Sequence, residues 1–390
     1  MIERIVSAAL LLPLCCVAQI HSSFPVDIFV GPAPQPVVAE GRARLAYELH
    51  ITNFAPFSIE LTGIDVRGQA ETPLASYHGE VLDKMMVPAE KVVVGGPADG
   101  AAKARVLGEG HSAVIFFDLT LDAGVPTPAA LRHRFSFSFT GNNGGAVERA
   151  VDIPVVSVLQ EPDAVLRPPL RGARWVAFNA FSNGASPDHR RAVNAIDGRV
   201  YIAQRFAIDW MRLGPDGRLF HGDSKSNVNF YGYGVEVFAV ADGQVADLKD
   251  GLPDNVGDNE RSKRVVTLDN VVGNYLTLDL GHGRFVLYAH LQSGSLKVKL
   301  GDKVKAGEAL ARLGNSGNSD APHLHIQMTD TNSPMAAEGI PYELETFSQL
   351  GVIDDSAVLD AGQPWQPKPN EKPVVHRGEF PIDKSVLTFP

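Results

Sequence analysis

Pro322-His323-Leu324-His325-Ile326-Gln327 is the stretch from which the fold of this chain can be worked out. Apolar Leu324 and Ile326 alternate with polar neighbours, and this period of two predicts a β-strand. The imidazoles of His323 and His325 then project from the same face of that strand. Two adjacent imidazoles form half of a metal site or an acid–base site, although a pair of surface histidines on an edge strand gives the same short pattern.

The bulk composition sets the expected number of domains and excludes some partners. A chain of 390 residues exceeds the usual size of one domain, so we expect two. A net charge of −10 argues against a nucleic-acid partner, which would require a basic face. It also argues against tight binding to anionic lipid.

The first eighteen residues are predicted to form a signal peptide. Arg4 gives a weakly positive start, Ile5–Val17 is an apolar core too short for a membrane span, and small residues precede a cleavage point at Gln19. Cys15 and Cys16 both fall inside this segment, so the mature chain would contain no disulfide. A lipoprotein anchor is the alternative, but the small residue expected before a lipidated cysteine is missing. We expect an exported protein of a bacterial envelope, periplasmic or extracellular, with no stable membrane insertion after cleavage.

Residues 24–160 predict an all-β, Ig-like sandwich, because alternating segments are separated by turn residues. Four histidines of this region are interpreted as surface or strand-filling residues. A linker over 161–170 follows, rich in proline. The expected strands are Ala46–Ile51, Ser58–Val66, Ala113–Leu121 and Arg134–Phe139, and the histidines are His50, His78, His111 and His133.

The sequence pattern changes in residues 171–335: short predicted strands bounded by glycine follow one another, and helical periodicity is nearly absent. The fold class is therefore all-β for this second domain as well. The proline-rich tail over 336–390 is expected to wrap the domain or to hang free, with one short helix near Tyr342–Leu350. The expected strands are Gly234–Val240, Gly243–Leu248, Arg264–Leu268, Asn274–Leu280 and Arg284–His290.

Polar residues interrupt two of the apolar segments in this domain. Asp209 lies within Phe206–Trp210, where a carboxylate is costly unless it is paired or binds a cation. His290 closes another apolar strand. Taken singly, each is more often a hydrogen-bonded core residue than a ligand. The glycine-rich loop Gly314–Ser319 has no lysine and no following helix, so it is not predicted to bind phosphate.

Several motifs in a fixed order resemble one protein family, from about Tyr201 to Asp330. They are Gly234–Val245, Gly281–Leu291, Leu300–Glu308, Gly314–Gly317 and His323–His325. In this order they resemble the lysostaphin/LytM-type zinc endopeptidases of bacterial cell walls. The resemblance implies a LytM-type antiparallel β-sheet/barrel-sandwich peptidase domain after the Ig-like sandwich. It also implies a zinc-dependent metalloendopeptidase that hydrolyses peptide bonds, with peptidoglycan cross-links as the expected substrate.

The resemblance implies roles for four residues. Asp209 and His325 would bind Zn²⁺, and His290 and His323 would be the catalytic histidines. Zinc with an open position lowers the pKa of a bound water towards 7. One imidazole could then take the proton of the water, while the other stabilises the oxyanion or protonates the leaving amine.

One position departs from the family pattern. The family has a histidine ligand four residues before the metal-binding aspartate, and here that residue is Arg205. Arginine keeps its proton and cannot bind zinc. His189 is the candidate third ligand, with His221 as a weaker one. The alternative is a catalytically degenerate envelope protein that regulates a wall hydrolase or binds wall peptides.

Overall fold

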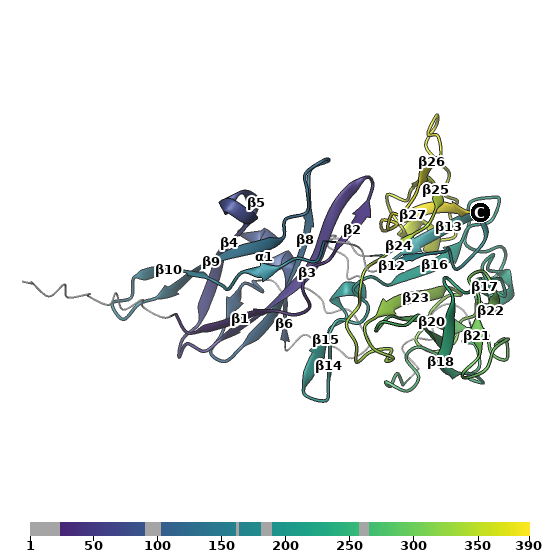
Figure 1. Cartoon of the computed structure of the whole chain (residues 1–390), viewed down its shortest axis with the longest axis horizontal. Helices are drawn as coiled ribbons and strands as arrows, with labels where there is room; N and C mark the ends of the chain where they lie inside the picture. The colour runs from purple at the N-terminus through teal and green to yellow at the C-terminus, as the bar shows by residue number, and fades with distance from the viewer. Residues whose placement is uncertain (1–23, 90–102, 161–163, 181–188, 257–264) are drawn as a thin grey trace, which may run out of the picture.

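The computed structural model describes residues 24–89, 103–160, 164–180, 189–256 and 265–390. Two β-rich parts lie next to each other, with the N-terminal part at the left and the C-terminal part at the right of Figure 1. The predicted signal peptide at 1–18 lies outside the described residues. No helix in the described part of the chain is long and apolar enough to cross a membrane.

The N-terminal part consists of two antiparallel sheets that share one apolar core. One sheet contains β1 (Val26–Val30), β2 (Pro36–Ala39), β3 (Arg42–Asn53), β6 (Met86–Pro88) and β8 (Ser112–Thr120). The other contains β4 (Ile59–Arg67), β5 (Pro73–His78), β7 (Val106–Leu107), β9 (Ala130–Thr140), β10 (Ala146–Asp152) and β11 (Val156–Ser157). The short helices η1 (Gln69–Glu71) and α1 (Glu80–Met85) lie between these strands in the sequence.

Strand β3 shows why the alternation of the sequence produces this core. Tyr47 and Leu49 face the shared core, so Glu48, which lies between them, projects from the opposite face. Tyr47 Oη also lies 2.7 Å from Nε2 of buried His133. The two-sheet arrangement follows from this alternation, whereas the Ig-like topology stays a prediction.

The C-terminal part is built on one long sheet with the strand order β21-β18-β19-β20-β23-β16-β13-β27-β25-β26. Its strands are β13 (Gly172–Phe178), β16 (Ile208–Arg212), β18 (Gly243–Lys249), β19 (Asn274–Asp279), β20 (Phe285–Leu291), β21 (Lys303–Val304), β23 (Leu324–Thr329), β25 (Phe347–Val352), β26 (Val374–His376) and β27 (Ser385–Phe389). Outside it lie β12 (Ala164–Leu166), β14 (Asn194–Ile196), β15 (Arg199–Tyr201), β17 (Glu236–Phe238), β22 (Ala309–Arg312), β24 (Tyr342–Leu344), η3 (His189–Arg191), η4 (Asn227–Asn229) and α2 (Ala357–Asp360).

Three local predictions in this part are wrong. The helix near Tyr342–Leu350 is replaced by β24 and β25, because Tyr342 and Leu344 are both buried at a spacing of two and β25 pairs with β27. The linker contains β12, which pairs in parallel with β24. Residues 265–268 of the strand expected at Arg264–Leu268 form no strand. Residues 336–390 thus extend the sheet instead of hanging free.

The two parts share an apolar interface. Val87, Val114 and Phe116 on the outer face of the β6–β8 sheet form one buried cluster with Val193 and Ile202 of the C-terminal part. All five side chains are at most 5% exposed. The outer face of a sandwich sheet, which usually meets water, is therefore buried here against the second part.

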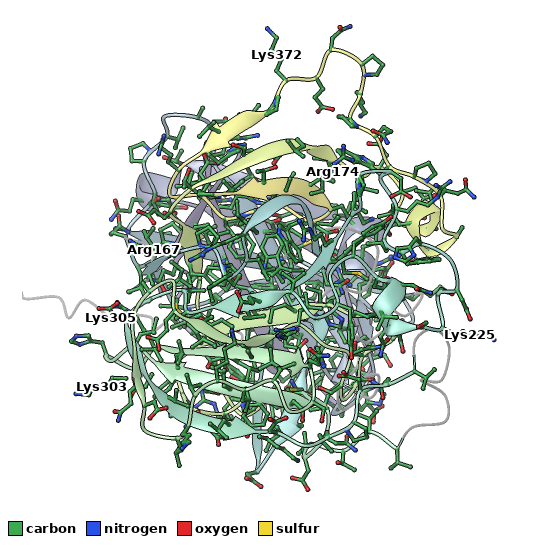
Figure 2. The ribbon with its side chains drawn as sticks, turned by 90° about the vertical axis from the view of Figure 1, so that its right-hand side faces the viewer. Arg167, Arg174, Lys225, Lys303, Lys305 and Lys372 are labelled. Carbon is green, nitrogen blue, oxygen red and sulfur yellow. The ribbon has the colours of Figure 1, made fainter. Side chains whose placement is uncertain are left out.

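Cationic side chains are spread around the C-terminal part. Lys303 and Lys305 lie at one edge of the view in Figure 2, Lys225 lies at the opposite edge, and Lys372 projects at the top. Lys305 is itself paired with Asp242, 2.7 Å away. These labelled cations are not gathered on one face, in keeping with the acidic composition.

Candidate metal centre and its histidines

Three neighbouring strands in the middle of the long sheet bring the central site residues together. Asp209 lies on β16, His325 on β23 and His290 on β20, and the sheet order is β20-β23-β16. Asp209 is the direct cross-strand partner of His325, and Ala289 is the partner of His325 on the other side. Residues far apart in the sequence are therefore side by side because of strand pairing alone.

The carboxylate of Asp209 is surrounded by three imidazoles. Its Oδ1 lies 3.0 Å from His325 Nδ1 and 3.3 Å from His323 Nε2, and its Oδ2 lies 3.1 Å from His189 Nε2. Asp209 is 8% exposed. Burial raises the pKa of this carboxyl, but the positive charges of His189 and His323 outweigh burial and hold the pKa well below its usual range. The carboxylate of Asp209 is thus a buried anion.

Within the described residues, His189, Asp209 and His325 form a group that could hold a metal ion. Their ligand atoms all lie within 4.8 Å of one another. Two imidazole nitrogens and one carboxylate oxygen are a donor set that suits zinc, with a fourth position left for water or substrate. The structure thus places the predicted ligand His189 beside the other two.

The hydrogen bonds around His325 test whether this set fits a cation. Gln327 donates from Nε2 to the Pro334 carbonyl at 2.9 Å, so its Oε1 faces His325 and accepts from His325 Nε2 at 2.9 Å. Gln327 Oε1 therefore places a proton on His325 Nε2, and burial lowers the pKa of the ring. On the other side of the ring, His325 Nδ1 lies 3.0 Å from Asp209 Oδ1. With its proton on Nε2, a neutral His325 directs the Nδ1 lone pair at the carboxylate, as a metal ligand does, so these residues fit a metal ion.

Sequence reasoning missed two residues that contact these ligands. Gln327 lies two residues after His325 on one face of β23 and continues the alternation that starts with His323 just before the strand, so the spacing of two could have revealed it. Asn179 follows β13 and donates from Nδ2 to Asp209 Oδ2 at 2.8 Å. It lies 30 residues before Asp209 and carries no local pattern, so only the pairing of β13 with β16 brings it there.

His290 is held as a neutral ring with one fixed tautomer. Its Nδ1 donates to the Ser316 carbonyl at 2.8 Å, which leaves the lone pair on Nε2. Burial, together with the nearby His323 and His325, lowers the pKa of His290 well below its ordinary value. The backbone φ of +59° is rare for a residue other than glycine, and such strain is found at functional sites.

His323 has the opposite electrostatic setting. Its ring centre lies 4.7 Å from that of His290, and its Nδ1 lies 2.8 Å from the Ala321 carbonyl. Burial lowers the pKa of His323, but Asp209 outweighs burial and the net shift is upwards. A neutral acceptor and a proton-carrying imidazole therefore lie next to each other. This is the division that general base and general acid require.

The loop Gly314–Ser319 fixes both of these histidines. Asn255 donates from Nδ2 to the carbonyls of Gly317 and Ser319, at 2.9 and 3.0 Å. Ser319 Oγ lies 3.1 Å from His323 Nδ1, and the Ser316 carbonyl holds His290. The loop is therefore a support for the two histidines.

Arg205, which the motif resemblance places at a histidine ligand position, is directed away from the site. Its Nε donates to Glu48 Oε2 at 2.7 Å, Nη1 to the Gly339 carbonyl at 2.6 Å and Nη2 to Glu338 Oε2 at 2.9 Å. The side chain is buried and all three nitrogens are engaged by these groups. Arg205 therefore serves the interface between the two parts, and His189 is in contact with Asp209.

Comparison with known proteins identifies the family of the C-terminal part. Residues 227–337 match the model of Peptidase family M23, so the chain contains an M23 domain of the lysostaphin/LytM type, and the resemblance drawn from the motifs is confirmed. The matched residues include His290, His323 and His325, whereas His189 and Asp209 precede them.

Two curated relatives match parts of the chain. One is the glycyl-glycine endopeptidase ALE-1 of Staphylococcus capitis, 33% identical over 127 residues, or 32% of this chain and 30% of that protein. The other is an uncharacterized metalloprotease of Buchnera aphidicola subsp. Baizongia pistaciae, 39% identical over 56 residues, or 14% of each protein. The chain thus spans less than a third of the length of either relative.

A solved structure also resembles part of the chain. The catalytic domain of lysostaphin from Staphylococcus simulans is 25% identical, with 32% of this chain and 86% of that chain covered. The TM-score is 0.19, which is too low to support any conclusion about function. The family assignment therefore rests on the sequence match.

Proposed function

We propose that this chain is an exported zinc-dependent metalloendopeptidase that hydrolyses peptide bonds, with peptidoglycan cross-links as its substrate. The observation that carries the proposal is the contact of Asp209 with two imidazoles, at 3.0 Å from His325 Nδ1 and 3.1 Å from His189 Nε2. The Gln327–Pro334 hydrogen bond helps to fix that arrangement, which suits a cation bound by the three residues. Export rests on the predicted signal peptide.

Zinc would be held by His189, Asp209 and His325, and the metal would supply a water of lowered pKa and a Lewis acid for the peptide carbonyl. The residues around it handle the protons. His290 Nε2 carries the lone pair and would accept a proton from the attacking water, because Nδ1 is already donated to Ser316. His323, whose pKa is raised, would deliver a proton to the leaving amine.

The substrate class follows from the relatives and from the family. One relative is a glycyl-glycine endopeptidase, so glycine-rich cross-bridges are the first peptides to assay, followed by cross-links that contain D-alanine. No covalent intermediate would be required, because the nucleophile would be water and not a side chain.

Metal analysis together with hydrolysis tests this function. The purified full chain should contain about one zinc per molecule, as expected for a single three-ligand site. Release of soluble fragments from dye-labelled peptidoglycan should be lost in His290→Ala and His323→Ala while the circular dichroism spectrum is unchanged. Turnover retained in either variant would contradict the assigned roles. A metal-free, inactive wild-type protein would instead support the degenerate envelope protein.

A further inference from the structure

His189 is the one proposed ligand that does not lie on the long sheet. It begins the three-residue helix η3, whose other two residues are arginines. Arg190 is 1% exposed and donates from Nη2 to the Phe117 carbonyl of β8 at 2.7 Å. Arg191 donates to the Lys84 carbonyl of α1. Both residues that follow His189 are therefore bound to the N-terminal sandwich.

Glu48 of the sandwich extends this attachment. Its Oε1 lies 3.5 Å from Arg190 Nη2, and its Oε2 accepts from Arg205 Nε at 2.7 Å. Glu48 is 2% exposed, so both ion pairs lie away from water, where charge interactions are stronger than at a surface. One buried carboxylate of the sandwich thus binds the two segments that lie on either side of the β14–β15 hairpin.

Apolar packing holds the same turn. The guanidinium groups of Arg190 and Arg191 both lie 5.5 Å from the ring centre of Phe116, within the range of cation–π contact. Val193 and Ile202 continue the contact through the buried cluster with Phe116. The turn that carries His189 is therefore packed on the sandwich by polar and apolar contacts together.

The other two proposed ligands have a different support. Asp209 and His325 are cross-strand partners within one sheet, so the C-terminal part fixes their separation by itself. A three-residue 3₁₀ turn has little internal rigidity, because its few hydrogen bonds have poor geometry. Its position must come from what it packs against: the His189 ring contacts Asp209 and His325, and the two residues after it bind the sandwich.

We propose that the N-terminal sandwich positions the third metal ligand, with Arg190 and Glu48 as positioning residues. The sandwich is then neither a spacer nor a separate binding module, because the metal centre is complete only when η3 is attached to β3 and β8. This inference rests on the proposed function in one respect, that the cation bound by His189, Asp209 and His325 is zinc.

The test measures zinc affinity in the full chain, by competition with a chromogenic chelator. Outer partners of metal ligands typically contribute about 10- to 100-fold to metal affinity, so Arg190→Met should weaken zinc binding by at least about tenfold. The His189→Ala variant is the reference, because its zinc affinity is that of a site without this ligand. Arg190→Lys keeps a donor for the Phe117 carbonyl and should recover most of the affinity.

A matched control comes from the same interface. Glu343 of β24 is 5% exposed and its Oε1 accepts from the Val38 amide of β2 at 2.9 Å, so it joins the same two parts through another pair of strands. Glu343→Gln should bind zinc as wild type does. The visible spectrum of the Co²⁺-loaded protein gives a second readout. Arg190→Met should shift it towards that of His189→Ala, and Glu343→Gln should leave it unchanged.

The possible outcomes separate the two proposals. A wild-type chain that binds no zinc overturns the proposed function. If wild type binds zinc and His189→Ala weakens it, while Arg190→Met keeps wild-type affinity and spectrum, the positioning role is overturned and the function stands. Should Arg190→Met fail to fold, Glu48→Gln replaces it, because it keeps the side-chain volume and removes only the charge. Wild-type affinity in a folded Glu48→Gln then overturns the inference.

Discussion

Replacement of Arg205 by methionine is the sharpest test of how the two parts are held together. The methionine side chain fills much of the same volume, but it leaves Glu48 and Glu338 without their shared cation and the Gly339 carbonyl without its donor. Arg205 is 4% exposed, so water cannot replace these contacts without opening the interface. Arg205→Met should therefore destabilise the protein strongly.

The magnitude follows from burial and from the remaining neighbours. Removal of one partner of a buried ion pair costs about 3–5 kcal/mol. Some compensation remains, because Arg190 lies 3.5 Å from Glu48 and Arg199 lies 3.8 Å from Glu338. We therefore expect the lower end of that range, about 3 kcal/mol, which is more than a hundredfold in the unfolding equilibrium.

Urea unfolding followed by tryptophan fluorescence measures this loss. The three tryptophans, Trp175, Trp210 and Trp365, all lie in the C-terminal part, so the signal reports the part that contains Arg205. Arg132→Met is the control, because that side chain is 54% exposed and surface ion pairs contribute at most about 1 kcal/mol.

A loss below about 1 kcal/mol in Arg205→Met would refute the reasoning from buried charge. Zinc stoichiometry in the same variant makes a second check. If Arg205 occupied the metal position, its removal would raise the zinc content. We expect no such rise, because the guanidinium binds Glu48, Glu338 and Gly339.

Three further predictions concern metal, pH and backbone packing. Removal of zinc by EDTA should lower the melting temperature, since a ligand at a hundred times its Kd stabilises by about 2.7 kcal/mol, and His189→Ala should show little EDTA effect. Burial lowers the pKa of His133 from 6.5 to about 4. Between these pH values the unfolded chain binds a proton at His133 and the folded chain does not, so stability decreases as the pH falls. Stability should fall by up to about 1.4 kcal/mol per pH unit between these values, and His133→Gln should flatten that dependence in urea titrations at pH 8 and pH 5. A Cβ on Gly314 would lie 2.3 Å from the Gln292 amide nitrogen, so Gly314→Ala should lower the melting temperature and the hydrolysis rate together; a normal melting curve would contradict this.

Local pattern was sufficient for the strands that carry the site. The alternation around His325, the apolar segment around Asp209 and the strand that ends at His290 all appear as β16, β20 and β23. The pattern works there because these strands are buried on the sheet, where side-chain period and burial coincide. It failed at Tyr342–Leu350, because partners supplied by β12 and β27 decide that segment.

Two of the three supporting residues could not be predicted from the sequence. Asn179, Asn255 and Gln327 orient the ligands and histidines by hydrogen bonds, and of these only Gln327 follows a readable spacing. Amides are common in loops, so their residue type alone carries no information about a site. Their role exists only once strand pairing has fixed which groups lie within 3 Å of each other.

The sequence by itself determined the M23 domain, the β-strand pattern and the His323–His325 pair, because these depend on short-range alternation and on motif order. Tertiary structure alone decided what Arg205 and His189 do. Glu48 lies 157 residues before Arg205, and the carboxylate draws that guanidinium into the interface. His189 is then left beside Asp209, 3.1 Å from its carboxylate. Buried charges must find partners wherever the fold provides them, and no local pattern records which distant residue that will be.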